Sequence, residues 1–217
     1  MVIGHKFWRR LARTARAAAA AVFAAGFGLP AAAQDAALEE LLAEASSVPS
    51  LQAVIVARDG TRIAEKAYGG HSLTKPTNIK SASKTVIAAL VGAAIDRGVI
   101  EGVDQPMADI LRDDVPDEAD PRIKEITVGN LLSMQAGLEP PSGANYGRWV
   151  LSDNWVRSAL EQPFIDDPGG RMLYSTGSSH LLSAILTEAT GKSTRANARA
   201  WFSAVEDFSI AGWERDP

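Results

Sequence analysis

The chain has 217 residues, of which 46% are hydrophobic and 22% charged, and it contains no cysteine. This composition excludes a disordered chain, a collagen-like repeat and a small disulfide-stapled domain. Without cysteine, thiolate metal sites, iron–sulfur clusters and thiol catalysis are also excluded. The formal net charge is −4, but residues 1–33 hold five of the 22 basic residues and no acidic one. Residues 34–217 therefore carry 17 basic and 26 acidic residues, a net charge of −9, which argues against nucleic acid or an anionic membrane surface as a partner.

Residues 1–33 have the organisation of a secretory signal peptide. A basic stretch at 6–16 precedes an apolar stretch at 17–29, and Pro30 then breaks the helix before three alanines that suit signal peptidase. The apolar stretch has about 13 residues, fewer than the roughly 20 that a bilayer-spanning helix needs. We therefore expect cleavage after Ala33 and an exported, periplasmic or secreted protein without a stable membrane anchor.

The rest of the chain predicts a short sheet followed by a helical region. Residues 51–57 and 61–68 are rich in strand formers and flank Asp59-Gly60, which predicts an antiparallel hairpin. Apolar periodicity predicts helices at 35–45, 81–97, 127–132, 151–160 and 178–189. Residues 81–97 are apolar nearly all the way round, so we expect this helix to be buried on most sides. Loops are expected at 71–80, 101–122 and 139–148, and mixed structure at 192–217.

The first motif with chemical potential is Ser81-Ala-Ser-Lys84, at the start of the apolar helix. On a helix, residues three apart lie on adjacent turns of one face. Serine is a weak nucleophile until a neighbouring group takes its proton, and desolvation favours a neutral lysine amine that can do so. Spacing alone leaves an alternative open, in which Ser81 is an N-cap and Lys84 a solvated first-turn lysine.

A second Ser-x-x-Lys match, Ser72-Leu-Thr-Lys75, serves as an internal control. Pro76 follows it directly and disfavours helical backbone at Lys75, so we predict a surface loop there.

Tyr174-Ser-Thr176 follows a Pro-Gly-Gly turn and precedes a predicted helix. A tyrosine hydroxyl beside a Ser/Lys pair can relay a proton to a leaving group, whereas a loop tyrosine with only a packing role is the alternative.

These residues resemble the serine hydrolases related to class C β-lactamases and penicillin-binding proteins. Four motifs match in order, at 81–84, 126–138, 168–176 and 179–191, and the resemblance covers roughly residues 35–194. Asp153-Asn-Trp-Val-Arg157 together with Tyr-Ser-Thr is most similar to the branch of 6-aminohexanoate-dimer hydrolases and carboxylesterases.

The resemblance implies an α/β fold of the β-lactamase/transpeptidase type, with an antiparallel sheet plus a helical region. It implies that Ser81 is the acylated nucleophile, Lys84 its base partner and Tyr174 the second proton-transfer group. Thr176 stands at a substrate-binding position where the family has Asn, so it keeps a hydroxyl and lacks the amide. The implied substrate is a small ester or amide, with a cell-wall-derived peptide among the candidates, and no cofactor is expected.

The family's third motif, Lys-Thr-Gly or His-x-Gly on a later strand, has no match in this chain. In the family that strand completes the sheet and donates one of two oxyanion-hole N–H groups, and losing one such donor costs about 10²–10³ in rate. We therefore expect residues 34–217 to be a partial domain without its C-terminal strands. Two hypotheses stay open: an exported serine hydrolase, and a catalytically inactive homologue that at most binds a peptide or a partner.

The histidines and tryptophans suggest no further chemistry. His5, His71 and His180 lack the spacing of a metal site, so we expect no metal. A Ser-His-Asp triad that uses His71 or His180 stays open, although no Gly-x-Ser-x-Gly accompanies either. We expect Trp149, Trp155 and Trp201 to lie in the core or in a pocket wall.

Overall fold

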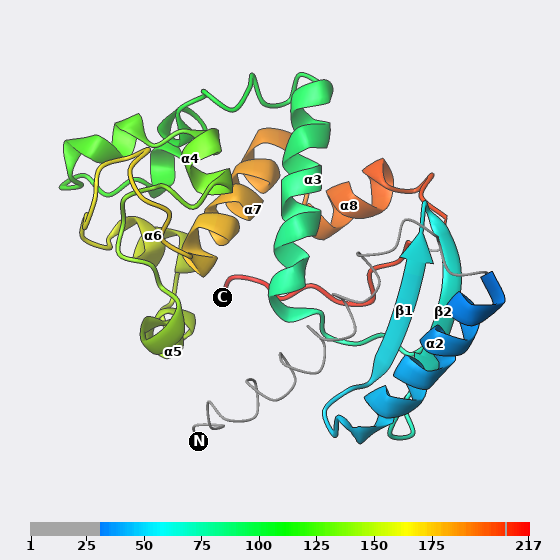
Figure 1. The fold of residues 1–217 in the computed structure, drawn as a ribbon. Helices are drawn as coiled ribbons and strands as arrows, with labels where there is room; N and C mark the ends of the chain where they lie inside the picture. The colour runs from blue at the N-terminus through cyan, green and yellow to red at the C-terminus, as the bar shows by residue number, and fades with distance from the viewer. Residues whose placement is uncertain (1–30, 207) are drawn as a thin grey trace. The chain divides into compact units, whose positions relative to one another are not determined.

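The computed structural model describes residues 31–206 and 208–217, which form two units (Figure 1). The first unit ends at Pro76 and the second begins at Thr77. The predicted signal peptide lies outside the described residues except for its last three, Ala31 to Ala33, which open the first described helix.

The first unit contains helix α2 (Ala31–Glu44) and a hairpin of β1 (Ala53–Arg58) and β2 (Thr61–Ala67). The strands are antiparallel, as the sequence predicts, and pair from Ala53 with Ala67 to Arg58 with Thr61. The turn residues Asp59 and Gly60 both have positive φ, 50° and 77°, the backbone that twisted two-residue hairpins require. This is the single sheet in the part of the chain that the structure describes.

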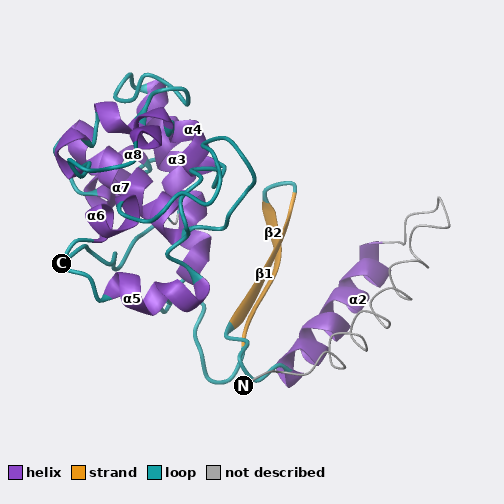
Figure 2. Ribbon diagram, turned by 90° about the vertical axis from the view of Figure 1, so that its left-hand side faces the viewer, coloured by secondary structure: helices purple, strands orange, loops and turns teal. Residues whose placement is uncertain are grey.

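The second unit is helical, and its longest helices lie side by side. α3 (Ser83–Asp96) packs along α7 (Thr176–Thr190), and α8 (Thr194–Trp201) packs against both. Around them lie the short helices α4 (Val128–Leu132), α5 (Tyr146–Val150) and α6 (Trp155–Leu160), of which α4 and α6 contact α7 (Figures 1 and 2). The two long helices therefore form the frame on which the loops of this unit are held.

The core of the second unit is apolar and lies between α3, α7 and the segments that connect them. Its buried side chains include Ile87, Leu90, Val91 and Ala94 of α3, Leu181, Leu182, Ile185 and Leu186 of α7, and Ile100, Met107, Leu111, Ile123 and Ile126. Burial of one such Leu or Ile contributes about 1.5–3 kcal/mol. Within the second unit taken alone, α3 is not buried on most sides as expected, because Ala88, Ala89 and Gly92 are exposed. Small residues raise the apolar count of a helix without requiring a neighbour to cover them.

Several helix ends follow the local sequence. Thr127 and Asn130 form a reciprocal capping box at α4, and Gly191 ends α7 with a left-handed φ of 64°. The predicted helix 151–160 is wrong in its first turn, because Asn154 caps α6 by accepting the backbone N–H of Arg157 at 2.7 Å. Helix α5 begins within the predicted loop 139–148, and α8 lies in the stretch predicted as mixed structure.

Two further kinds of feature are absent from the described residues. None of their helices combines the length and apolar character that crossing a membrane requires. Within the same residues, no group of three or more His, Asp or Glu side chains could hold a metal ion.

Candidate active site

Ser81 and Lys84 contact each other at the start of α3. Ser81 belongs to a 3-10 turn (Lys80–Ala82) that runs directly into the helix, and Lys84 lies in the first helical turn. Lys84 Nζ donates a hydrogen bond to Ser81 Oγ at 3.4 Å. The N-cap position of α3 is Ala82, and no side chain caps the helix, so the alternative of Ser81 as an N-cap has no support. The three-residue spacing thus brings the two side chains together as expected.

Tyr174 completes this cluster from a different part of the chain. Lys84 Nζ lies over its ring, 5.3 Å from the centroid, and 47% of the tyrosine is exposed. The pKa of Tyr174 is lowered from its ordinary value of 10, first by hydrogen bonding from Ser81 and then by the hydrogen bond and positive charge of Lys84, while slight burial opposes the shift. All these effects of Ser81 and Lys84 favour the phenolate, which is a proton acceptor.

The extended backbone before α7 orients the Tyr-Ser-Thr segment. Ser175 has φ −132° and ψ 119°, and in an extended chain alternate side chains point to the same side. Tyr174 and Thr176 therefore share one side, while Ser175 is buried and accepts the backbone N–H of Ser178 at 3.0 Å as the N-cap of α7. Capping the helix and presenting the tyrosine are thus done by neighbouring residues that face opposite ways.

Thr176 is tied to a residue that the sequence analysis missed, Ser142. The backbone N–H of Thr176 donates to Ser142 Oγ at 2.7 Å, and Ser142 Oγ donates to Thr176 Oγ1 at 3.1 Å. Among the described residues, no hydrogen bond joins Thr176 to Ser81 or Lys84. The side chain predicted to bind substrate is thus held by the loop that precedes α5.

Gln135 is a second polar residue that the sequence analysis missed. Its side-chain amide donates to the backbone carbonyl oxygens of Gly169 and Gly170. Its backbone carbonyl oxygen accepts the N–H of Gly169 at 2.8 Å. Both glycines lie in the turn that leads to Tyr174. Gln135 falls inside the motif at 126–138, but the spacing of that motif gives no sign of which distant loop it contacts.

His180 of α7 has a partner of its own. Its Nε2 lies 3.0 Å from Asp216 Oδ2, and its ring packs edge-on against Trp149 and Trp155 at 5.5 Å each. Asp216 Oδ1 also accepts the backbone N–H of Trp155 at 2.8 Å. In the described part of the chain, no hydrogen bond links His180 to a serine, so this histidine gives the triad alternative no support.

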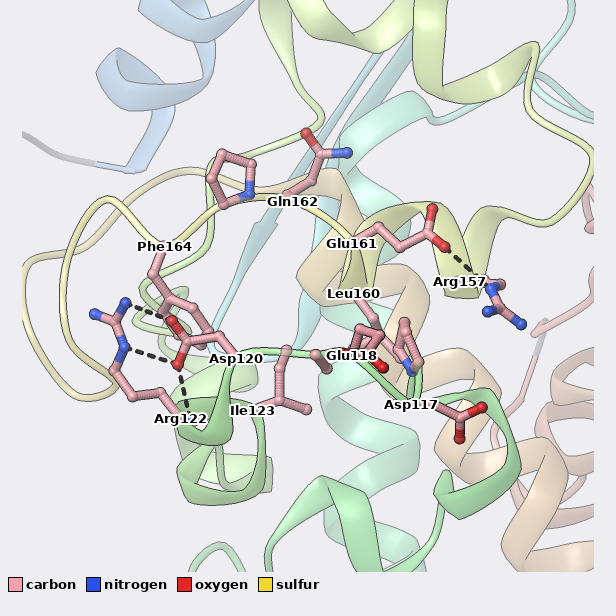
Figure 3. Close-up of a pocket in the computed structure, with 13 residues that line it drawn as sticks. Asp117, Glu118, Asp120, Arg122, Ile123, Arg157, Leu160, Glu161, Gln162 and Phe164 are labelled. Carbon is pink, nitrogen blue, oxygen red and sulfur yellow. Dashed lines mark hydrogen bonds and ion pairs between the residues drawn. The ribbon is translucent and has the colours of Figure 1, made fainter.

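A cavity of about 670 Å³ lies elsewhere in the second unit, between residues 116–123 and 157–164 (Figure 3). At one end Arg122 pairs with Asp120 at 2.7 Å and stacks on Phe164, and at the other Arg157 pairs with Glu161 at 3.0 Å. None of Ser81, Lys84, Tyr174 and Thr176 lines this cavity. The charged groups around it are mostly paired with one another.

The fold and the motifs agree with a family comparison. The Beta-lactamase family model matches residues 35–202, which is most of the chain and includes Ser81, Lys84, Tyr174 and Thr176. The chain therefore belongs to the beta-lactamase family, the class that also takes in the penicillin-binding proteins and related serine hydrolases. The predicted family and the predicted α/β fold are confirmed.

Solved structures with the same fold are distant in sequence. A candidate beta-lactamase from Bacteroides dorei DSM 17855 has 22% identity and a TM-score of 0.63 over 78% of this chain and 50% of its own. A candidate 6-aminohexanoate-dimer hydrolase from Bacillus anthracis has 18% identity and a TM-score of 0.58 over 83% and 47%. EstCE1, a hydrolase with promiscuous acyltransferase activity, has 21% identity and a TM-score of 0.62 over 81% and 52%.

The chain spans about half the length of these structures. A search of curated proteins found no match. At these identities the likeness concerns the fold alone.

Proposed function

We propose that this protein is an exported serine hydrolase that cleaves an ester or amide bond through an acyl-Ser81 intermediate. The observation that carries the proposal is the cluster in which Lys84 contacts both Ser81 and Tyr174. A serine hydroxyl needs an adjacent proton acceptor to become a nucleophile. Here two titratable groups adjoin one hydroxyl, and the lowered pKa of Tyr174 favours its proton-accepting form.

The reaction has two halves that use the same three groups. As Ser81 Oγ attacks the substrate carbonyl, its proton passes to the Lys84–Tyr174 pair, which then gives a proton to the departing alcohol or amine. In the second half a water molecule gives its proton to the pair and attacks the acyl carbon, and Ser81 takes the proton back as the acid leaves. General acid–base transfer of this kind contributes about 10²–10⁴ in rate.

The substrate class is inferred from the structural neighbours and from Thr176. The structural neighbours include a candidate 6-aminohexanoate-dimer hydrolase and a hydrolase with promiscuous acyltransferase activity. Thr176 offers a hydroxyl in place of the amide that the family has at this position. We therefore propose a small ester or amide as the substrate, with a cell-wall-derived peptide as a further candidate.

Export is the second part of the proposal. It rests on the order of basic, apolar and small residues in the first 33 positions. The net charge of −9 on the remaining residues agrees with a protein that binds neither nucleic acid nor anionic lipid.

Steady-state hydrolysis tests the activity. We expect the 217-residue chain to release p-nitrophenol from p-nitrophenyl acetate, and Ser81→Ala to lose this turnover while keeping the same circular dichroism spectrum. Ser72→Ala is the matched control, because Ser72 belongs to the other Ser-x-x-Lys match, and it should keep the full rate. A folded chain without Ser81-dependent turnover would support the alternative of a non-catalytic homologue.

A further inference from the structure

The segment that carries Tyr174 is fixed on both sides by residues from other loops. On its N-terminal side, Gln135 binds the turn at Gly169 and Gly170 through its side-chain amide and its backbone carbonyl. On its C-terminal side, Ser142 accepts the N–H of Thr176 at 2.7 Å. Tyr174 itself is exposed, so packing alone does little to fix its ring.

A strained residue adds to the N-terminal attachment. Met134 has φ +59°, a left-handed conformation that residues with a side chain rarely adopt. Its carbonyl oxygen accepts the N–H of Leu173 at 2.8 Å, directly before Tyr174. Backbone strain of this kind persists only where the surrounding structure enforces it, and it clusters at functional sites.

The C-terminal attachment uses both hydrogen-bonding capacities of one hydroxyl. Ser142 Oγ accepts from the backbone of Thr176 and donates to its side chain. The backbone bond fixes the residue two positions after Tyr174, and the extended conformation of Ser175 transmits that placement to the tyrosine. Alanine at position 142 would remove both bonds, whereas threonine would keep the hydroxyl.

We propose that Gln135 and Ser142 are positioning residues that hold Tyr174 against Lys84 and Ser81. They act through Tyr174 and do not touch the reacting atoms. The inference rests on the proposed function for the role of Tyr174 in proton transfer, but the position of Tyr174 can be measured without any turnover. If the attachments fail, Tyr174 moves away from Ser81 and Lys84, and its phenolate loses the hydrogen bond from Ser81 and the neighbouring positive charge of Lys84.

Titration of Tyr174 by phenolate absorbance at 295 nm provides that measurement. The chain has three tyrosines, so subtracting the titration of Tyr174→Phe isolates the signal of Tyr174. We expect a midpoint below 10 in the unchanged chain, and an upward shift of that midpoint towards 10 in Gln135→Ala and Ser142→Ala. Ser142→Thr should keep the original midpoint. Gln162→Ala is the matched control for Gln135, because its side-chain amide also donates to a backbone carbonyl, that of Ser158, at 2.8 Å.

Ester hydrolysis gives the second readout. We expect kcat of Gln135→Ala to fall about tenfold with KM nearly unchanged, because a small displacement of a catalytic group slows chemistry more than binding. In Ser142→Ala, kcat should fall by a similar factor and KM should also rise, because Ser142 holds the side chain of Thr176 as well. If Gln135→Ala does not fold, Gln135→Glu has nearly the same size and loses the same two donated hydrogen bonds.

The outcomes separate the two proposals. An unchanged Tyr174 midpoint in the folded variants would overturn the positioning role, whatever the activity. A shifted midpoint in a chain that hydrolyses no ester would support the positioning role and count against the proposed function.

Discussion

The ammonium group of Lys84 lies over the ring of Tyr174, 5.3 Å from its centroid. The same nitrogen donates to Ser81 Oγ at 3.4 Å, so one lysine adjoins both the candidate nucleophile and the candidate proton acceptor. A positive charge at this point favours the phenolate of Tyr174 and will also stabilise negative charge that develops beside Ser81. Lys84 is therefore the residue whose replacement should affect the site most broadly.

Replacing Lys84 with Met should slow Ser81-dependent ester hydrolysis by about 10²–10⁴, because it removes both a proton-transfer group and the charge beside Tyr174. Lys84→Arg keeps the charge on a larger planar group that does not give up its proton, so it should restore little of the rate. Lys75→Met, in the other Ser-x-x-Lys match, is the control and should keep the full rate. A wild-type rate in Lys84→Met would contradict the assignment.

The rate should depend on pH through Tyr174. Its pKa lies below 10 because Ser81 and Lys84 stabilise the phenolate, so the active fraction rises with pH and the rate should increase through a midpoint below 10. Tyr174→Phe should remove this ascending limb. Lys84→Met should move it to higher pH, since loss of the ammonium raises the pKa towards 10. A profile of kcat/KM from pH 6 to 10.5 for each variant provides the test, and an identical limb in Tyr174→Phe would count against the role of the tyrosine.

A close approach at α7 makes Gly177 intolerant of a side chain. A Cβ there would lie 2.5 Å from Pro141 Cγ and 3.3 Å from Ala159 Cβ, so Gly177→Ala should lower the free energy of unfolding by about 1–3 kcal/mol. Gly92→Ala in α3 is the matched control with the opposite expected effect on stability, because a Cβ there meets nothing within 4 Å. It should stabilise by up to about 1 kcal/mol through helix propensity. Urea unfolding of both variants measures the two changes, and equal stabilities would contradict the packing.

Export through a signal peptide predicts a single N-terminus for the mature protein. Expression in a bacterial host with a periplasm should give a product that starts at Gln34, because Ala31 to Ala33 offer the small residues that signal peptidase needs. Intact mass of the periplasmic fraction checks the cleavage position. Ala33→Pro should block processing there, and a full-length product confined to the cytoplasm with the unchanged sequence would contradict the signal peptide.

Local features of the fold could be predicted from the sequence. The hairpin follows from Asp59-Gly60, whose left-handed backbone fits a two-residue turn, and the end of α7 follows from Gly191. The contact between Ser81 and Lys84 follows from a three-residue spacing in a helical context. In each case the residues that determine the structure lie within one or two turns of one another.

Contacts between distant segments could not be predicted in this way. Ser142 and Thr176 are 34 residues apart, and Gln135 and Gly170 are 35 apart, so no local pattern relates them. The split of the predicted helix 151–160 was missed because the capping role of Asn154 competes with an apolar periodicity that continues through it. The family resemblance predicted that Tyr174 lies beside Ser81 and Lys84, a contact between distant segments that residue spacing alone does not predict.

Covalent labelling by a fluorophosphonate tests the central claim most directly. An activated serine displaces fluoride from phosphorus and keeps the phosphonyl group, which intact mass and peptide mapping then locate. We predict one adduct on the 217-residue chain, at Ser81, that is absent from Ser81→Ala and retained in Ser72→Ala. A folded chain that forms no adduct, or one that keeps its adduct after Ser81→Ala, would contradict the account.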